Sequence, residues 1–241
     1  MDTKELEKLI ARCLEDFYNR RSQRLETLKL KDYLNRKNPY LYKAIGTEKA
    51  SDIVEEILSA YMIASDEGIF GDAFFEPIAK IASGGTVSPS EGVDIAIETG
   101  KKYLAIAVKS GPNIFNSSQK KRQNDEFNTL RSRLLKLHKQ FDALLGHCYG
   151  KVRTEPSKTK IFRDRSGQAF WTEITGDPDF YLKLVRLMKD EPSKHRVIYK
   201  RAWEHAVNRF TAEFIKDFCN GDGSINWEKL VRFNSGMKEK Q

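Results

Sequence analysis

The stretch EGVDIAIETGKKYLAIAVKSGPN, residues 91–113, predicts the β-hairpin around which the rest of the chain is organised. Residues 92–98 and 103–109 alternate well enough for two strands, and the polar TGKK between them, residues 99–102, suits a turn. Because a four-residue turn joins antiparallel neighbours, the two strands are expected to pair with each other. This hairpin is the element from which a catalytic site is inferred.

The predicted pairing gathers three residues toward one end of the hairpin. If residues 99–102 form the loop, Glu98 lies opposite Tyr103 and Asp94 lies opposite Ala107. Lys109 is on the same face as Ala107 because side chains repeat every two residues along a strand. We therefore expect Asp94, Ala107 and Lys109 to lie together on one face.

The segments before the hairpin are predicted to be helical. A first set of apolar residues follows helical spacing and predicts a helix at the start of the chain. Pro39 is expected to break this helix. A second helix is expected from about Ser51, followed by a turn at Gly68–Gly71 and a shorter helix. The first apolar set is Leu6, Leu9, Ile10, Cys13, Leu14 and Phe17.

The segments after the hairpin predict a long helix, further strands and more helices. Asn116 with Gln119 fits a variant of the capping box at the start of the long helix. An apolar stripe follows, which is expected to pack on the sheet or, alternatively, to form a dimer seam. Strands are expected within 144–152 and 158–164, and the last third is mainly helical. The stripe consists of Phe127, Leu130, Leu134, Leu137, Phe141 and Leu144. The element order predicts an α/β fold with a mixed sheet.

Composition favours an anionic partner for a folded protein. Lys and Arg number 42 against 34 Asp and Glu, a formal net charge of +8, and 39% of residues are hydrophobic. Such an excess favours nucleic acid, although a basic enzyme with no polyanionic partner fits equally well. No apolar run approaches the ~20 residues of a membrane-spanning helix.

The cysteines and histidines predict neither disulfides nor a zinc site. Cys13, Cys148 and Cys219 are odd in number and far apart, which is typical of a reducing cytoplasm. His147 precedes Cys148 directly, but neighbours on a strand point to opposite faces.

The hairpin cluster suits the hydrolysis of a phosphodiester. Carboxylates bind magnesium, which polarises the phosphate and lowers the pKa of an attacking water. A lysine can orient that water or stabilise developing negative charge. Lys109 fits this role, and the alternative for it is a lysine at an exposed strand end.

These residues resemble the PD-(D/E)XK nucleases, and within them the type II restriction endonucleases. Asp94 in GVD stands at the family's metal-binding aspartate, with Val93 in place of the usual proline. AVK, residues 107–109, stands at the (D/E)XK position, and KSGPN leads into NSSQ as in restriction enzymes. KNPYL near residue 40, GQAFWTEITGD at 167–177 and DGSINWEKL at 222–230 extend the resemblance over most of the chain.

The resemblance implies a fold, an activity and partners. The expected fold is restriction-endonuclease-like, a mixed central sheet flanked by helices with additional N- and C-terminal helices. The expected organisation is one nuclease domain, 1–241, in which residues 1–50 are helical, residues 51–165 form the catalytic core and residues 166–241 are mainly helical. The expected activity is Mg²⁺-dependent cleavage of double-stranded DNA at a short sequence, by a cytoplasmic homodimer.

The family commonly takes a further acid from the helix before the hairpin. Glu76 is on that helix and is expected to hold the metal together with Asp94; the alternative for Glu76 is a solvated residue beside Pro77. Glu98 shares the face of Asp94, but four residues along a strand span about 13 Å. Glu98 is therefore expected to be a solvated residue at the turn.

Ala107 departs from the family pattern because alanine cannot bind a cation. Three explanations fit the sequence: a small residue is tolerated and Glu76 replaces the missing carboxylate, a Glu→Ala change was introduced to block cutting, or the site has decayed naturally. The sequence does not choose among them.

The segment after Lys109 is expected to contact DNA. Amides at a helix N-terminus bind phosphate, and Asn and Gln side chains pair with phosphate or base edges. The alternative for its run of cations is a solvated first helical turn. The expected contacts are Ser110, Asn113, Asn116, Ser117, Ser118, Gln119, Lys120, Lys121 and Arg122.

Three other functions compete with a restriction enzyme. A DNA-binding protein on the same fold with a dead site would bind without cutting. A repair or junction nuclease would select DNA structure rather than sequence. A basic α/β protein with no nucleic-acid role would bind DNA weakly and without the steep salt dependence of counterion release.

Overall fold

The computed structural model describes residues 2–112 and 116–237, and it separates into two compact units. Unit 1 comprises Met1–Phe17 and Glu67–Pro192, and unit 2 comprises Tyr18–Asp66 and Ser193–Gln241. Among the described residues, three helices contribute to both units: α1 (Thr3–Thr27), α4 (Ala50–Phe70) and α9 (Glu191–Phe218). Across the described ranges, no helix combines the length and apolar character needed to span a bilayer.

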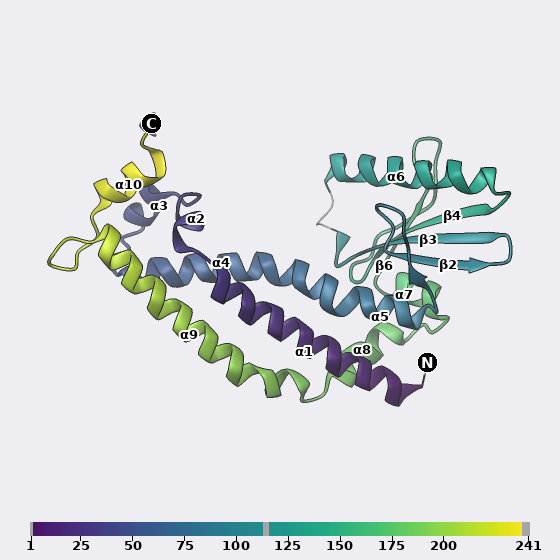
Figure 1. Cartoon of the computed structure of the whole chain (residues 1–241), viewed down its shortest axis with the longest axis horizontal. Coiled ribbons are helices and arrows are strands. Elements are labelled where there is room, and N and C mark those ends of the chain that lie inside the picture. The colour runs from purple at the N-terminus through teal and green to yellow at the C-terminus, as the bar shows by residue number, and fades with distance from the viewer. Residues whose placement is uncertain (1, 113–115, 238–241) are drawn as a thin grey trace. The chain divides into compact units, whose positions relative to one another are not determined.

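Unit 1 contains a mixed sheet, as the sequence predicts (Figure 1). The strand order is β1-β2-β3-β4-β6-β5 within the described residues. The pairs β3–β4 and β4–β6 are parallel, and the other pairs are antiparallel. The strands are β1 (Thr86–Val87), β2 (Ile95–Thr99), β3 (Lys102–Lys109), β4 (Gln140–His147), β5 (Arg153–Thr154) and β6 (Arg163–Ser166).

The register of the β2–β3 hairpin is the predicted one, although its loop is shorter. Glu98 pairs with Tyr103, as expected. Thr99 also pairs with Lys102, so the loop is two residues rather than four. Gly100 opens this loop with a φ of 58°, a left-handed conformation that a two-residue hairpin requires and that glycine adopts without strain. Shortening both ends of the loop equally leaves the pairing unchanged.

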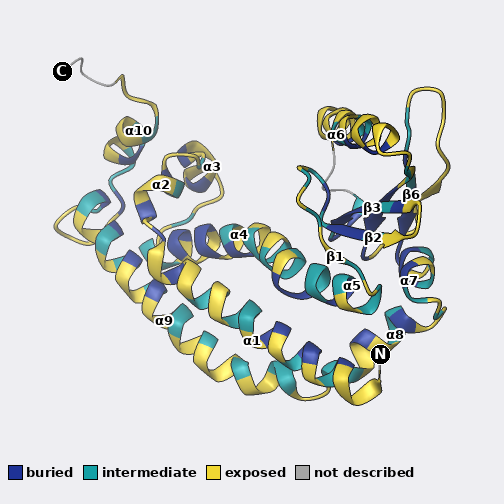
Figure 2. Ribbon diagram, turned by 45° about the vertical axis from the view of Figure 1, so that its right-hand side comes forward, coloured by how far each residue is buried: buried dark blue, intermediate teal, exposed yellow. Residues whose placement is uncertain are grey.

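Helices cover both faces of the sheet. Helix α6 (Ser117–Lys136) packs on one face, and α1, α5 (Glu76–Ala82), α7 (Gln168–Thr175) and α8 (Phe180–Met188) supply residues to the core on the other. Figure 2 shows the buried residues of the strands between these helices. Along β3, Ala105 and Ala107 belong to the α6 core, whereas Ile106 and Val108 belong to the opposite one. The alternation predicted for β3 is therefore confirmed.

The predicted turn at Gly68–Gly71 is wrong, because the chain stays helical there. Helix α4 passes into a π-helical turn, Gly71–Phe75, and then directly into α5. A Cβ on Gly71 would lie 2.6 Å from Ser110 Oγ, so glycine permits close approach of the helix to the end of β3. Phe70 and Phe74 stack with ring centroids 4.5 Å apart, which places aromatic packing where the sequence predicts a loop.

The capping box is confirmed, but the predicted length of α6 is wrong. Asn116 accepts from Gln119 N at 2.9 Å, and Gln119 accepts from Asn116 N at 2.8 Å. The helix ends at Lys136, and residues 141 and 144 of the predicted stripe belong to β4. Leu137 is 65% exposed at the C-cap. A strand at residues 140–147 pairs with the edge of β3 that faces away from β2, and further helix would leave that edge unpaired.

Unit 2 is mainly helical in its described residues, with turns between the helices and an isolated β-bridge between Cys219 and Ile225. It combines portions of α1, α4 and α9 with α2 (Leu30–Leu34), α3 (Pro39–Ala44) and α10 (Trp227–Ser235). Pro39 begins α3 rather than breaking the first helix, and Asn38 caps α3 by accepting from the backbone. The core is formed mainly by Leu25, Leu30, Leu34, Ile53, Ile57, Leu58, Phe210, Phe214 and Leu230.

Phe127 tests the packing of α6 on the sheet. It is fully buried against the strands, so Phe127→Ala is expected to lower the free energy of unfolding by about 3–5 kcal/mol in urea denaturation. Leu135→Ala on the same helix, where the side chain is 54% exposed, is the control and is expected to change it by less than about 0.5 kcal/mol. Equal losses in the two variants would contradict this packing.

Candidate active site

Asp94 and Lys109 meet at the end of the hairpin, as the sequence predicts. Asp94 directly precedes β2, and Lys109 is the last residue of β3. Lys109 Nζ lies 3.6 Å from Asp94 Oδ2, and the two side chains are 28% and 26% exposed. The backbone N–H of Val108 donates to the same carboxylate oxygen at 2.6 Å. The carboxylate is thus fixed by the strand that carries the lysine.

Glu76 is the third charged residue that the structure brings to this end. It begins α5, directly after the π-helical turn. Its pKa is raised first by burial and then by the negative charges of Asp94 and Asp72, while Lys109 and Lys80 oppose the rise. Because the charges of Asp94 and Lys109 both act on Glu76, the three groups form one electrostatic site. A solvated Glu76, the alternative interpretation of the sequence, does not fit this half-buried position.

Ala107 is fully buried in the core beneath α6. It lies opposite Leu145 of β4, which is also fully buried. Its methyl group cannot bind a metal, and the residues around it are apolar. The position two residues before Lys109 therefore provides no metal ligand. A carboxylate that acts together with Lys109 must therefore come from another position in the chain.

The residues present fit a magnesium ion in a limited way. Within residues 2–112 and 116–237, no cluster of three or more His, Cys, Asp or Glu side chains could hold a metal. Two carboxylates, Asp94 and Glu76, share the site. A bound cation would offset the repulsion between their negative charges. Mg²⁺ commonly uses one or two carboxylates, with waters and substrate phosphates as its remaining ligands. Glu98 pairs instead with Lys139, at the other end of the hairpin.

Contacts that the sequence did not reveal hold the end of β3. Ser110 is buried, and its hydroxyl donates to Glu67 O at 3.1 Å. Tyr149 donates to Glu67 Oε1 at 2.8 Å, and its ring lies against Gly111. The hydroxyl of Ser110, an expected DNA contact, is therefore used within the protein. These contacts join residues up to 82 positions apart, and no local pattern announces them.

A buried polar group lies one strand away from Lys109. His147 pairs with Lys109 in the parallel register, and its Nδ1 lies 3.3 Å from Gly111 O. Its Nε2 lies 3.9 Å from Asp164 Oδ1. Burial alone would raise the pKa of Asp164, but the nearby imidazole of His147 and hydrogen bonds from Lys160 and Thr154 outweigh it and lower that pKa. Asp164 is thus an anion that stabilises the sheet behind the site.

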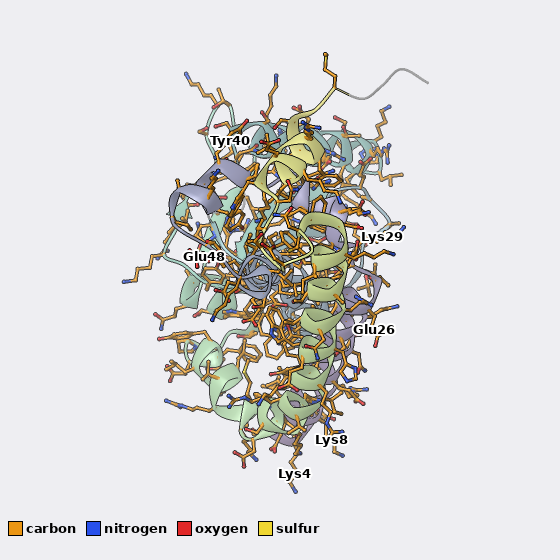
Figure 3. The ribbon with its side chains drawn as sticks, turned by 90° about the vertical axis from the view of Figure 1, so that its left-hand side faces the viewer. Lys4, Lys8, Glu26, Lys29, Tyr40 and Glu48 are labelled. Atoms are coloured by element: carbon orange, nitrogen blue, oxygen red, sulfur yellow. The ribbon has the colours of Figure 1, made fainter. Side chains whose placement is uncertain are left out.

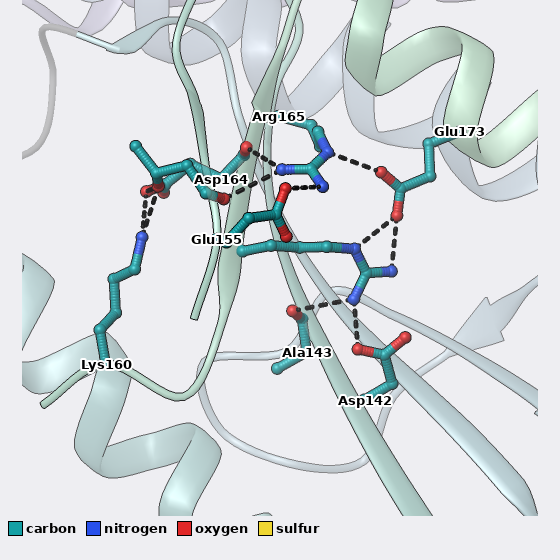
Figure 4. Close-up of polar contacts among 9 residues, drawn as sticks. Asp142, Ala143, Glu155, Lys160, Asp164, Arg165 and Glu173 are labelled. Atoms are coloured by element: carbon teal, nitrogen blue, oxygen red, sulfur yellow. Dashed lines mark hydrogen bonds and ion pairs between the residues drawn. The ribbon is translucent and has the colours of Figure 1, made fainter. Parts of the chain in front are cut away.

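Two arginines of β6 are neutralised within unit 1, as Figure 4 shows. Arg163 pairs with Asp142 and with Glu173. Arg165, which is buried, pairs with Glu155 at 2.6 Å and with Glu173 at 3.0 Å. These cations are occupied by carboxylates, so the charge they could offer to a polyanion is largely cancelled.

The first turn of α6 presents exposed polar residues. Arg122 pairs with Glu126 and Glu91, each at 2.7 Å, and those hydrogen bonds raise its pKa. Lys120 and Lys121 are exposed and form no ion pair with the residues that the structure describes. Asn113 lies outside the described residues. The remaining expected contacts on this turn are also exposed: Asn116, Ser117, Ser118 and Gln119.

Comparison with known proteins gives one family. A family model described as type II restriction endonuclease EcoO109I matches residues 4–196 of the 241. The matched segment includes the hairpin, Glu76 and the whole of α6. No curated protein matches the chain.

The raised pKa of Glu76 predicts a pH-dependent stability. A carboxyl whose pKa is raised by folding destabilises the fold above its ordinary value of 4.5 and has no effect well below it. Glu76→Gln is therefore expected to have a higher Tm than the unmodified chain at pH 7, with the difference vanishing near pH 3.5. Calorimetry in the presence of a metal chelator measures the Tm difference at both pH values. Glu48→Gln, which alters an exposed glutamate, is the control. A Tm difference independent of pH would contradict a charged, strained Glu76.

Proposed function

The chain belongs to the family of the type II restriction endonuclease EcoO109I, a family of DNA endonucleases, and on that premise we propose that it cuts double-stranded DNA at a short specific sequence with Mg²⁺. The observation that carries the proposal is the placement of Lys109 Nζ 3.6 Å from Asp94 Oδ2, with Glu76 in the same field. A positively charged lysine beside two carboxylates is the arrangement of groups that phosphodiester hydrolysis needs. With DNA as substrate and free cysteines, the proposed location is the cytoplasm.

Asp94 and Glu76 are the proposed metal ligands. When bound, the metal polarises the phosphate and lowers the pKa of a water. Asp94 reaches it in a fixed orientation because the Val108 N–H already holds one carboxylate oxygen. Burial and then the negative charge of Asp94 raise the pKa of Glu76, and a bound cation would offset both effects.

Lys109 is the proposed partner of the attacking water. Its ammonium group has three donors, so it can orient a water while still facing Asp94. The water oxygen forms a bond to phosphorus and releases a proton to solvent, one phosphorus–oxygen bond to the sugar breaks, and the leaving oxygen takes up a proton from solvent. The positive charge of Lys109 offsets the negative charge that grows on the phosphate during this exchange.

Glu76 is proposed to replace the carboxylate that position 107 lacks. Ala107 is buried in an apolar core and cannot contribute a ligand, whereas Glu76 already responds to the charge of Asp94. Of the three explanations that the sequence left open, we choose a small residue at 107 with an acid recruited from α5. A decayed or deliberately blocked site predicts no cutting and remains the alternative.

The start of α6 is proposed to bind the DNA backbone. Its exposed residues Ser117, Ser118, Lys120 and Lys121 surround amides of a helix N-terminus, which favour phosphate. The capping side chains of Asn116 and Gln119 and the paired Arg122 can add contacts at the edge. Ser110 is left out because its hydroxyl donates to Glu67.

A homodimer is proposed to form through unit 2. A palindromic site calls for two-fold symmetry in the protein. Tyr40, labelled in Figure 3, is 64% exposed, and Leu41 and Ile45 beside it are 54% and 60% exposed. Tyr40 also lines an apolar pocket with Trp227 and Val231. An apolar surface of this kind is typical of a contact between subunits.

Substitutions at the hairpin test the mechanism. Lys109→Ala and Asp94→Asn are each expected to slow DNA cleavage in Mg²⁺ at least about 100-fold, because each removes a group that acts on the reacting phosphate or its water. Cleavage is measured under single-turnover conditions, with DNA binding measured separately. Lys102→Ala, an exposed lysine at the other end of β3, is the control and should cut normally. Undiminished cutting by Lys109→Ala would overturn the assignment.

Substitution of an exposed apolar residue tests the dimer. Ile45→Asp is expected to convert a dimer to a monomer in sedimentation velocity, since it places a charge in the proposed interface. The matched control is Ile63→Asp, which alters an isoleucine that is 70% exposed on α4 of the same unit. A monomeric unmodified chain, or dissociation by both variants alike, would contradict this interface.

A further inference from the structure

The segment between β4 and β6 carries unpaired positive charge. Residues 151–160, called the 151–160 arm below, contain four cations and one acid. Lys151, Arg153 and Lys158 are exposed, and no carboxylate of the described residues pairs with them. Figure 2 shows an exposed loop next to β6. Three unpaired cations on ten residues form a strongly basic surface.

The other charges of the 151–160 arm hold it in place. Lys160 Nζ donates to Asp164 Oδ2 at 2.8 Å and also to Thr154. Glu155 pairs with the buried Arg165. Lys160 and Glu155 therefore attach the arm to β6. Lys151, Arg153 and Lys158 are the cations of the arm that remain for a partner.

The tip of the arm is also ordered by backbone hydrogen bonds. Ser157 N donates to Lys160 O at 2.7 Å, and Lys160 N donates back to Ser157 O at 3.3 Å. Together with the pairing of β5 to β6, these bonds define the conformation of the arm before any partner binds. An ordered surface loses less conformational entropy on binding than a mobile one.

Asn124 of α6 attaches the arm to the helix that begins at the site. Its Nδ2 donates to Thr159 O at 3.3 Å, and its Oδ1 accepts from Ile161 N at 3.0 Å. Asn124 lies one helical turn after Lys120 and Lys121. The cations of the arm and those of the first turn of α6 thus belong to one surface.

That surface lies on the side of the sheet to which two of the three candidate site residues belong, whereas Glu76 comes from α5 on the other side. Helix α6 packs on the face to which Ala107 belongs. Asp94 and Lys109 share that face by the register of the hairpin and the two-residue period of strands. A partner bound to the reacting groups on that face is therefore within reach of the cations of both the helix and the arm.

We propose that the 151–160 arm is a second phosphate-binding surface for duplex DNA, through Lys151, Arg153 and Lys158. The proposal rests on the proposed function and deepens it by naming a contact outside the catalytic hairpin. Duplex DNA is the partner that fits, because its regularly spaced negative charges can engage cations spread over two elements at once. Such contacts position the protein without reading sequence.

The test is the salt dependence of binding to a duplex that carries many sequences. The variant Lys151→Ala/Arg153→Ala/Lys158→Ala is compared with the unmodified chain by fluorescence anisotropy, without divalent metal so that no cutting occurs. Each lost phosphate contact lowers the slope of log K against log salt by about 0.9, so a fall of about 2–3 is expected. Affinity at low salt is expected to fall at least about 10-fold.

The matched control removes the same charge from the opposite end of the same unit. Lys101→Ala/Lys102→Ala/Lys136→Ala alters exposed residues at the hairpin loop and the last turn of α6. This variant should keep both the slope and the affinity of the unmodified chain. Equal Tm values for both variants and the parent exclude unfolding as the cause.

The outcomes separate the arm from the function. If the unmodified chain shows no salt-dependent binding to duplex DNA, the proposed function fails and the arm proposal fails with it. If the unmodified chain binds but the arm variant keeps its slope, or if the control loses as much, the arm proposal alone is overturned. A loss confined to the arm variant supports it.

Discussion

The structure depends on the register of one hairpin. Pairing of β2 with β3 places Asp94 beside Lys109, and the N–H of Val108 fixes the carboxylate of Asp94 by a hydrogen bond. A slip of one residue would move Lys109 to the opposite face, because side chains alternate along a strand. The buried alternation of Ala107 and Val108 between the two cores opposes such a slip. The packing that stabilises the sheet therefore also defines the site.

The features predicted from the sequence are those determined by local chemistry. The hairpin register follows from alternation, and the start of α6 follows from the capping chemistry of Asn116. The end of α6 was not predictable, because spacing by three and four continues through Phe141 into residues that pair as a strand. The attachment of Ser110 to Glu67 depends on long-range contacts, which no local pattern encodes.

We propose that Glu76 supplies the carboxylate that position 107 lacks. Ala107 contributes packing to the α6 core and no charge. Glu76 approaches from a different element, and the continuous helix through Gly71 is what brings it there. The three charged groups of the site thus come from the residue before β2, the end of β3 and the start of α5, all in unit 1. Because the proposed dimer contact lies in unit 2, catalysis and assembly are proposed to use different segments of the chain.

The most direct measurement is cleavage of a mixed-sequence plasmid in Mg²⁺ by the unmodified chain and by Ala107→Glu, with Glu76→Gln beside them. If Glu76 supplies the second carboxylate, the unmodified chain yields discrete fragments and Glu76→Gln does not. Fragments from Ala107→Glu alone would contradict this role of Glu76 and identify Ala107 as the inactivating residue. If the unmodified chain and Ala107→Glu both bind DNA but do not cut it, the nuclease proposal fails. The function is then that of a DNA-binding protein.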